Sequence, residues 1–351
     1  MTLPETMPAL VLHEWGGPLV PQERPVPVPG REEVLLRVDA CGIGDTLNNM
    51  RSGRNAAMPR ASVPRVLGHE VAGTVVAVGD AVDLVSVGQR VFAYMYLTCG
   101  RCDACRFGHD PMCRDPGGMI GLSIDGGFAG YVVLPAANVE PLPDEVSSVD
   151  ACVAVDAVAT PWHALRAVAP VDPTDTLVVV GAGGGVGVHA LAVGRLLGAR
   201  VIGVDVTDAK LAFALEHGAD DVVDGRSDDV AAAIAHLTDG RGADVILDYV
   251  ASSATLDAGF RALASNGTLV VQGVNPPGDE FRVEPRAFVH RQLAVRGSRY
   301  ASRREVREVM ELVRRGAIEP VVTVRVSLDD VGSVFAMLER RELLGRAAIV
   351  G

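Results

Sequence analysis

The rhythm of apolar and polar positions changes once along the chain, near residue 176. Before it, short apolar runs such as Leu10–Leu12, Glu33–Val38 and Val71–Val78 are separated by proline and glycine, and Val20–Gly30 is too rich in proline for a helix. From Thr176 onward, β-branched runs alternate with longer apolar stretches. Such alternation is typical of a parallel sheet with helical crossovers. The pattern therefore predicts a β-rich domain and an inserted α/β domain.

The predicted elements of the second half alternate in order. The strands are 177–180, 201–204, 221–223, 245–250 and 268–272, and the helices are 186–197, 209–217, 230–237 and 255–263. The alternation breaks at residues 275–278, Asn-Pro-Pro-Gly, and is followed by a helix at 303–315 and a last strand at 347–350. A chain of 351 residues exceeds the usual size of one core, so two domains are expected.

Charge and composition narrow the class of partner. The formal net charge of −12 argues against nucleic acid or an anionic membrane as partner, because surfaces that bind phosphates are normally basic. The sequence has no apolar run of roughly 18 residues that could span a membrane, and Met1–Ala9 lacks a basic segment followed by an apolar one. We therefore expect a cytoplasmic protein whose partner is a small molecule or another subunit.

In the stretch Val178–Gly187, an apolar β-branched run stops at a cluster of glycines, which predicts a strand, a tight turn and the start of a helix. Glycines here would let a pyrophosphate approach the backbone N–H groups at the helix N-terminus. Asp205 ends the next strand, where a carboxylate binds an adenosine ribose and repels a 2′-phosphate. The order of these features predicts a dinucleotide site that favours NAD over NADP, although a purely structural turn would also use glycines.

Four of the six cysteines lie close together, at Cys99, Cys102, Cys105 and Cys113. In a reducing compartment such spacing indicates metal thiolates before disulfides, and four thiolates suit a closed, structural zinc site. The alternative is four unrelated free cysteines. We expect zinc to hold together a lobe at residues 95–115 that has little apolar core of its own.

The sequence resembles the medium-chain, zinc-containing alcohol dehydrogenase superfamily along nearly its whole length. The resemblance rests on five features, which are Gly68-His69-Glu70 before Val71-Ala72-Gly73, the turn Val87–Val91, the four-cysteine lobe, the glycine turn with Asp205, and Gly345-Arg346 before the last strand. It implies an α/β protein with a β-rich, GroES-like catalytic domain (1–155 and 299–351) and a Rossmann NAD-binding domain (156–298). It also implies a homodimer or homotetramer.

By the same resemblance, His69 and Asp156 are the ligands of a catalytic zinc, with Glu70 and Asp45 as weaker candidates. The family's cysteine ligand is missing, since Gly44 stands in its place, and the remaining donors form a set richer in oxygen. Thr46 matches the hydroxyl that starts the family's proton relay. Asn49 replaces a histidine further along that relay and cannot titrate.

The resemblance also assigns cofactor contacts. They fall on Gly181, Gly183, Gly184 and Gly187 of the turn, on Asp205 and Lys210 at the ribose, and on Thr160, Val250, Gly273 and Arg346. The turn has one residue more than G-x-G-x-x-G, and its spacing is similar to that of the zinc-free quinone and enoyl reductases. The first hypothesis is an NAD-dependent dehydrogenase of an alcohol, aldehyde or ketone. The alternatives are a C=C or quinone reductase without catalytic zinc, and a cofactor-binding protein without activity.

Overall fold

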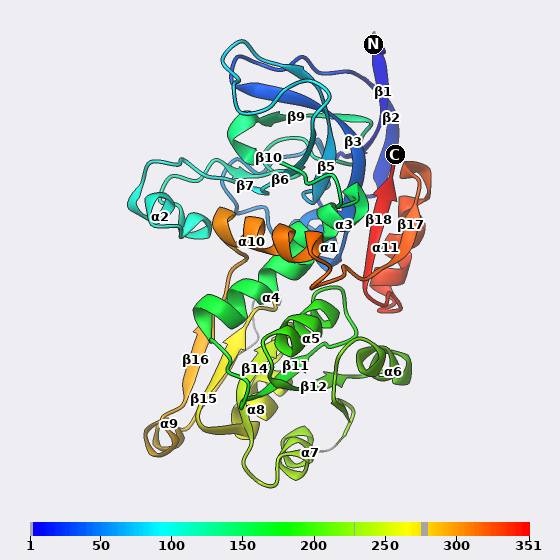
Figure 1. The fold of residues 1–351 in the computed structure, drawn as a ribbon. Coiled ribbons are helices and arrows are strands. Elements are labelled where there is room, and N and C mark those ends of the chain that lie inside the picture. Colours follow the sequence, from blue (N-terminus) through cyan, green and yellow to red (C-terminus); the bar gives the residue numbers. More distant parts are fainter. Residues whose placement is uncertain (1–2, 228, 275–279) are drawn as a thin grey trace. The chain divides into compact units, whose positions relative to one another are not determined.

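The computed structural model describes residues 3–227, 229–274 and 280–351, which form two compact units (Figure 1). The first unit comprises Met1–Asp156 and Ser302–Gly351, and the second comprises Ala157–Ala301. The predicted break at residues 275–278 lies outside the described residues. No helix within the described ranges is long and apolar enough to cross a membrane.

The first unit is mostly β-structure, as predicted. Its elements in chain order are β1 (Thr6–Leu12), β2 (Leu19–Pro25), β3 (Glu33–Ile43), α1 (Asp45–Arg51), β4 (Arg65–Val66), β5 (Val71–Val78), β6 (Arg90–Ala93), β7 (Tyr96–Leu97), α2 (Asp103–Arg106), β8 (Gly118–Met119), β9 (Tyr131–Pro135), β10 (Val139–Pro141), α3 (Ser148–Val153), α10 (Arg303–Arg314), β17 (Val322–Val326), α11 (Val331–Glu339) and β18 (Arg346–Val350).

One seven-stranded sheet organises this unit. Its strand order is β10-β6-β5-β3-β18-β17, and β9 also pairs with β3. Strand β18 is antiparallel to β3, with Ala347 opposite Ile43, and β5 pairs with the other side of β3, with Val71 opposite Cys41. The C-terminal strand thus returns to the first domain, next to residues that lie some 300 positions earlier.

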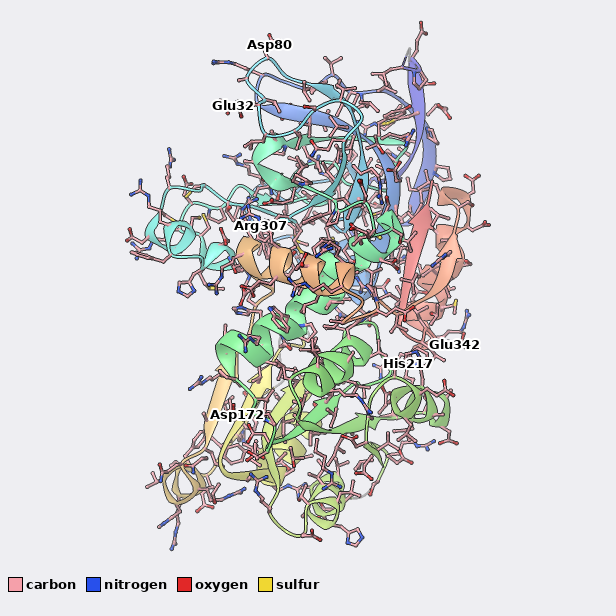
Figure 2. The ribbon with its side chains drawn as sticks, viewed as in Figure 1. Glu32, Asp80, Asp172, His217, Arg307 and Glu342 are labelled. Carbon is pink, nitrogen blue, oxygen red and sulfur yellow. The ribbon has the colours of Figure 1, made fainter. Side chains whose placement is uncertain are left out.

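Helix α10 is held to this unit by capping and by ion pairs. Ser302 and Glu305 form a capping box at its N-terminus, which satisfies backbone N–H groups that have no partner within the helix. Arg307 on the same helix (Figure 2) makes a two-pronged contact with Glu140 of β10, at 2.9 Å from Nε and 2.6 Å from Nη2. These contacts fix the start of the second segment of the unit.

The second unit is a parallel sheet with helical crossovers. Its elements are α4 (Ala159–His163), β11 (Thr176–Val180), α5 (Gly187–Leu196), β12 (Arg200–Asp205), α6 (Asp208–Glu216), β13 (Asp221–Asp224), α7 (Val230–Leu237), β14 (Ala243–Asp248), α8 (Ser253–Ala262), β15 (Leu263–Val271), α9 (Pro285–Arg291) and β16 (Ala294–Gly297). The sheet order is β13-β12-β11-β14-β15-β16. This is the doubly wound order of a parallel sheet. Strands are added on one side of β11 and then on its other side, and ligands bind at the carboxyl ends of the strands beside this switch point.

Candidate active site

Three neighbouring strands bring the residues of the predicted catalytic centre together. Glu70 lies just before β5, and its carbonyl accepts a hydrogen bond of 2.9 Å from the Gly42 N–H of β3. Arg346 opens β18, and the register of that strand with β3 places it beside Gly44. Because the three strands are adjacent, residues 42–44, 70 and 346 share one end of the sheet.

The three predicted metal ligands form one buried cluster. His69 Nε2 lies 3.4 Å from Asp156 Oδ2 and 3.5 Å from Glu70 Oε1. His69 and Glu70 are fully buried and Asp156 is buried. Among the described residues, His69 Nδ1 and Glu70 Oε2 have no hydrogen-bond partner. Buried polar groups without partners are costly to a fold, which marks the cluster as a site rather than as packing.

Arg346 brings a positive charge into this cluster. Its Nη2 contacts Glu70 Oε1 directly and lies 3.9 Å from Asp156 Oδ2, and its side chain is 2% exposed. Burial lowers the pKa of Arg346 to about 10, and the Asp45 carboxylate opposes this shift. The guanidinium is therefore still charged at neutral pH and balances one of the two carboxylates.

Gly44 and Gly42 make room for this ion pair. A Cβ on Gly44 would overlap the guanidinium of Arg346, and a Cβ on Gly42 would overlap the carboxylate of Glu70. The volume that a cysteine side chain would occupy at position 44 is thus filled by Arg346. The sequence showed that the thiolate is missing, but it did not show that Arg346 fills the space. The pairing of β18 with β3 is what brings Arg346 to this position.

The donor set fits a divalent ion. Tetrahedral zinc with nitrogen and oxygen ligands at about 2.0–2.1 Å would place its ligand atoms roughly 3.3–3.4 Å apart, close to the two distances that His69 Nε2 makes here. The donor atoms of His69, Glu70 and Asp156 all lie within 4.8 Å of one another. Arg346 contacts Glu70 directly and competes with a metal for it, which leaves His69 and Asp156, 3.4 Å apart, as the stronger ligand candidates.

The other predicted catalytic residues lie at the start of α1. Asp45 is exposed and Thr46 is partly exposed in the first turn of the helix. Asp45 is not part of the cluster of possible ligands found among the described residues. Cys41, by contrast, is fully buried, and burial raises the pKa of its thiol, as expected for an inert cysteine.

In the second unit, the predicted cofactor residues meet at the carboxyl end of β11. Asp205 Oδ2 accepts a hydrogen bond of 2.9 Å from the Gly183 N–H. A Cβ on Gly183 would lie 2.5 Å from Lys210 Cβ, and a Cβ on Gly187 would overlap the Gly181 carbonyl. Both positions therefore need glycine for the close approach of the turn to α5 and α6.

The next strand ends complete this corner. Val250 follows β14, is 41% exposed, and lies 3.5 Å from the position of a Cβ on Gly181. Gly273 follows β15 and packs against the backbone of Tyr249 and Val250. Gly184 lies within the turn, Thr160 on α4 is partly exposed, and Arg346 belongs to the first unit.

Lys210 has a feature that the sequence pattern did not suggest. It is the only lysine in the chain, and the other 31 of the 32 lysines and arginines are arginines. It lies in the first turn of α6, where its backbone N–H is capped by Thr207 at 3.2 Å. Because it is the one lysine in 351 residues and lies against the glycine turn, its amine can be modified selectively to report on the cofactor site.

The four cysteines of the lobe converge as predicted. The Cys102 Sγ lies 3.6 Å from Cys105 Sγ and 4.0 Å from Cys113 Sγ, and Cys99 Sγ lies 4.0 Å from Cys105 Sγ. Zinc–sulfur bonds of about 2.3 Å would place the sulfurs roughly 3.8 Å apart in a tetrahedron. Backbone hydrogen bonds, the strongest from Arg114, lower the pKa of Cys102 to about 6, which favours its thiolate. The cluster fits a closed zinc site.

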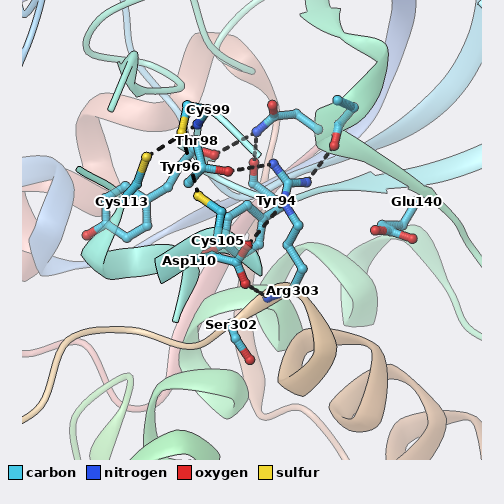
Figure 3. Close-up of polar contacts among 12 residues, drawn as sticks. Tyr94, Tyr96, Thr98, Cys99, Cys105, Asp110, Cys113, Glu140, Ser302 and Arg303 are labelled. Atoms are coloured by element: carbon cyan, nitrogen blue, oxygen red, sulfur yellow. Dashed lines mark hydrogen bonds and ion pairs between the residues drawn. The ribbon is translucent and has the colours of Figure 1, made fainter. Parts of the chain in front are cut away.

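Arg303 of α10 anchors this lobe (Figure 3). Its backbone N–H donates to Asp110 Oδ2 at 3.1 Å, its Nη1 donates to the Ala137 carbonyl at 2.5 Å, and its guanidinium lies 4.4 Å from the centre of the Tyr94 ring. Asp110 and Tyr94 are both buried. Tyr94 therefore belongs to the support of the lobe.

Comparison with known proteins identifies the family. Residues 30–144 match the alcohol dehydrogenase GroES-like domain, and residues 185–315 match the zinc-binding dehydrogenase domain. The NAD-dependent alcohol dehydrogenase of Sulfurisphaera tokodaii is 32% identical over 350 residues, which cover 98% of this chain and 100% of the relative. The chain belongs to the zinc-type alcohol dehydrogenase family.

Other members of this family show its range. The crystal structure of the alcohol dehydrogenase from Aeropyrum pernix superposes with a TM-score of 0.90, at 31% identity, over 98% of this chain and 100% of that one. The acryloyl-coenzyme A reductase of Sulfurisphaera tokodaii is 26% identical over 332 residues, 93% of this chain and 95% of the relative. The predicted fold and superfamily are thus confirmed, and this alcohol dehydrogenase homologue is an oxidoreductase.

The geometry of the lobe predicts how its cysteines affect metal content. We expect Cys105→Ser to lose the structural zinc and to lower the melting temperature, because serine is a poor zinc ligand and the lobe has no buried residues in its helix α2 to replace the metal. Metal analysis and thermal unfolding measure this. Cys152→Ala, which removes a buried cysteine outside the lobe, should keep the zinc; loss of zinc in both variants would contradict the assignment.

The overlap at position 44 predicts a stability effect. Gly44→Ala should lower the free energy of unfolding by about 1–3 kcal/mol, because a methyl group must displace the buried guanidinium of Arg346. Chemical denaturation measures this. Gly332→Ala, in α11 of the same unit, meets no atom within 4 Å and should change stability by less than about 1 kcal/mol. Equal stability of Gly44→Ala and the parent would show that Arg346 does not need this space.

Proposed function

We propose that this chain is an NAD-dependent dehydrogenase that transfers hydride between the nicotinamide and an alcohol, aldehyde or ketone. The observation that carries the proposal is the buried cluster of His69, Glu70 and Asp156, with donor atoms at metal-ligand spacing. The glycine turn with Asp205 supports NAD as the cofactor. A cytoplasmic location and a homodimer or homotetramer carry over from the sequence as further proposals.

In this proposal each residue has a defined task. His69 and Asp156 hold a catalytic zinc, whose chemistry when bound is to polarise the substrate oxygen. Glu70 stays paired with Arg346 and adjusts the charge beside the ligands. Thr46 relays the proton that the alcohol hydroxyl releases, because its hydroxyl accepts that hydrogen bond and gives up its own proton, while the hydride leaves the carbinol carbon for the nicotinamide of NAD⁺. Asn49 cannot pass that proton on, so it leaves to water.

A second zinc is proposed in the lobe of Cys99, Cys102, Cys105 and Cys113, where it is structural. This site is closed by four thiolates and offers no open position for a substrate. The parent protein should therefore contain two zinc ions of different roles, and the two sites can be separated by mutation.

A specific observation also favours a second function, reduction of an activated C=C bond without catalytic metal. Position 44 has no thiolate, and Arg346 already supplies a positive charge beside Glu70. The acryloyl-coenzyme A reductase among the relatives has this type of activity by its name. In this case hydride would pass from NADH to the β-carbon, and a proton would then reach the α-carbon.

Metal content and turnover together decide between these functions. We expect two zinc ions per chain in the parent and one in Asp156→Asn. The parent should oxidise a secondary alcohol with NAD, and the rate should fall in Asp156→Asn, which lacks the second zinc. Asp150→Asn, whose carboxylate contacts only Ser147 among the described side chains, should keep both ions. One zinc in the parent, with reduction of an enone by NADH, would support the second function instead. Cofactor binding with no turnover of either substrate would contradict both.

The single lysine offers a direct test of the cofactor site. An amine-acylating reagent can modify only Lys210 and the N-terminal amine. We expect bound NADH to protect Lys210 and to leave the N-terminal amine reactive, because Lys210 packs against Gly183 of the turn. Peptide mass spectrometry measures both sites in one sample. Equal modification of Lys210 with and without NADH would place the cofactor elsewhere.

A further inference from the structure

An arginine clamp lies beside the predicted ribose site, and sequence reasoning did not find it. Arg226 follows β13, and its guanidinium makes two contacts with Asp224, from Nε to Oδ1 at 2.8 Å and from Nη2 to Oδ2 at 2.7 Å. The same Nη2 lies 2.5 Å from Asp208 Oδ1, in the first turn of α6. Two carboxylates thus hold one guanidinium.

The clamp is adjacent to Asp205 by backbone geometry. Strands β12 and β13 are parallel neighbours, and their register places Asp224 beside Asp205. The Gly225 N–H donates to the Asp205 carbonyl at 2.8 Å, and a Cβ on Gly225 would lie 3.1 Å from Val206 Cγ1. The loop that carries Arg226 therefore closes onto Asp205, which ends β12, and onto Val206, which follows it.

The net charge of the residues around the predicted ribose site disfavours a phosphate there. Two cations, Lys210 and Arg226, would suit a 2′-phosphate on the ribose, which carries nearly two negative charges and prefers a guanidinium as bidentate partner. Three carboxylates outnumber them, however, at Asp205, Asp208 and Asp224. Hydrogen bonds from Arg226 lower the pKa of Asp224, and hydrogen bonds to Asp224 and Asp208 raise the pKa of Arg226, so Asp224 and Arg226 are both charged at neutral pH.

We propose that the clamp of Asp208 and Asp224 on Arg226 determines the cofactor preference of this chain together with Asp205. Asp205 repels the 2′-phosphate, and the clamp withholds the guanidinium that would otherwise receive it. Selectivity for NAD over NADP is then the property of four residues rather than of one carboxylate. The inference rests on the proposed function, because it concerns the dinucleotide site.

Removal of one of the two carboxylate charges tests the proposal, because Arg226 is then left with the charge of Asp224 alone. In Asp208→Asn, which keeps the hydrogen bonds of Asp205, NADPH should bind more tightly than in the parent while NADH binding stays within about twofold. In Asp205→Ser with Asp208→Asn, NADPH should bind at least about tenfold more tightly than in Asp205→Ser alone, since a charge-assisted hydrogen bond is worth about that factor. Dissociation constants from NADPH and NADH fluorescence measure both effects.

Two controls separate this mechanism from a general change of charge. Adding Arg226→Gln to the double variant should abolish the gain, because the guanidinium is the receptor. Asp221→Asn removes a carboxylate from the opposite end of β13, where Asp221 pairs with Arg200 at 2.8 Å, and should leave NADPH binding unchanged. The gain should also shrink with added salt, since the groups are exposed.

The outcomes distinguish the inference from the function on which it rests. No gain from Asp208→Asn in either background, or a gain that survives Arg226→Gln, would overturn the clamp while leaving NAD binding intact. Failure of the parent to bind either dinucleotide would instead contradict the proposed function. Tighter binding of NADPH than of NADH by the parent would overturn the clamp and the predicted preference for NAD together.

Discussion

The buried pair of Arg346 and Glu70 is the constraint around which the first unit is arranged. A carboxylate and a guanidinium removed from water are tolerated only when they compensate each other, and removal of one partner leaves a buried charge. The pair requires that β5 and β18 flank β3, because Glu70 directly precedes β5 and Arg346 opens β18. It also requires glycine at positions 42 and 44, where side chains would overlap the charged groups. The strand order, the two glycines and the C-terminal arginine are therefore all required by the same buried ion pair.

The same constraint explains why the residue is arginine. Burial disfavours the charged form of any base, and a lysine would lose its charge far more readily than an arginine in the same place. The pKa of Arg346 falls to about 10 and still leaves the guanidinium charged at neutral pH. The planar group also reaches Glu70 and Asp156 from one position, which a single ammonium on a flexible stem does less well.

Much of this architecture could be predicted from the sequence, and the reasons for the rest are physical. Strand β5 and helix α7 have the predicted bounds because their apolar patterns are strong, and the Cys99–Cys113 lobe was predicted because its spacing is specific. Strand β17 alternates between exposed and partly buried positions and gave no clear apolar pattern. The close approach of Arg346 to Gly44 and the contact of Arg226 with Asp208 were not predicted. Both depend on strand pairing and side-chain reach, which spacing along the chain does not encode.

The two arginine sites differ in a way that bears on their roles. At Arg346 the groups are buried, so loss of either member leaves a buried charge without its partner and affects folding. At Arg226 the groups are exposed, so the clamp adds little to stability and can exchange one anionic partner for another. The buried pair fixes the geometry of the cluster of His69, Glu70 and Asp156, whereas the exposed clamp determines which dinucleotide the ribose site accepts. This chain, whose basic residues are arginines at all positions but Lys210, thus uses the same side chain for rigid positioning in one unit and for selectivity in the other.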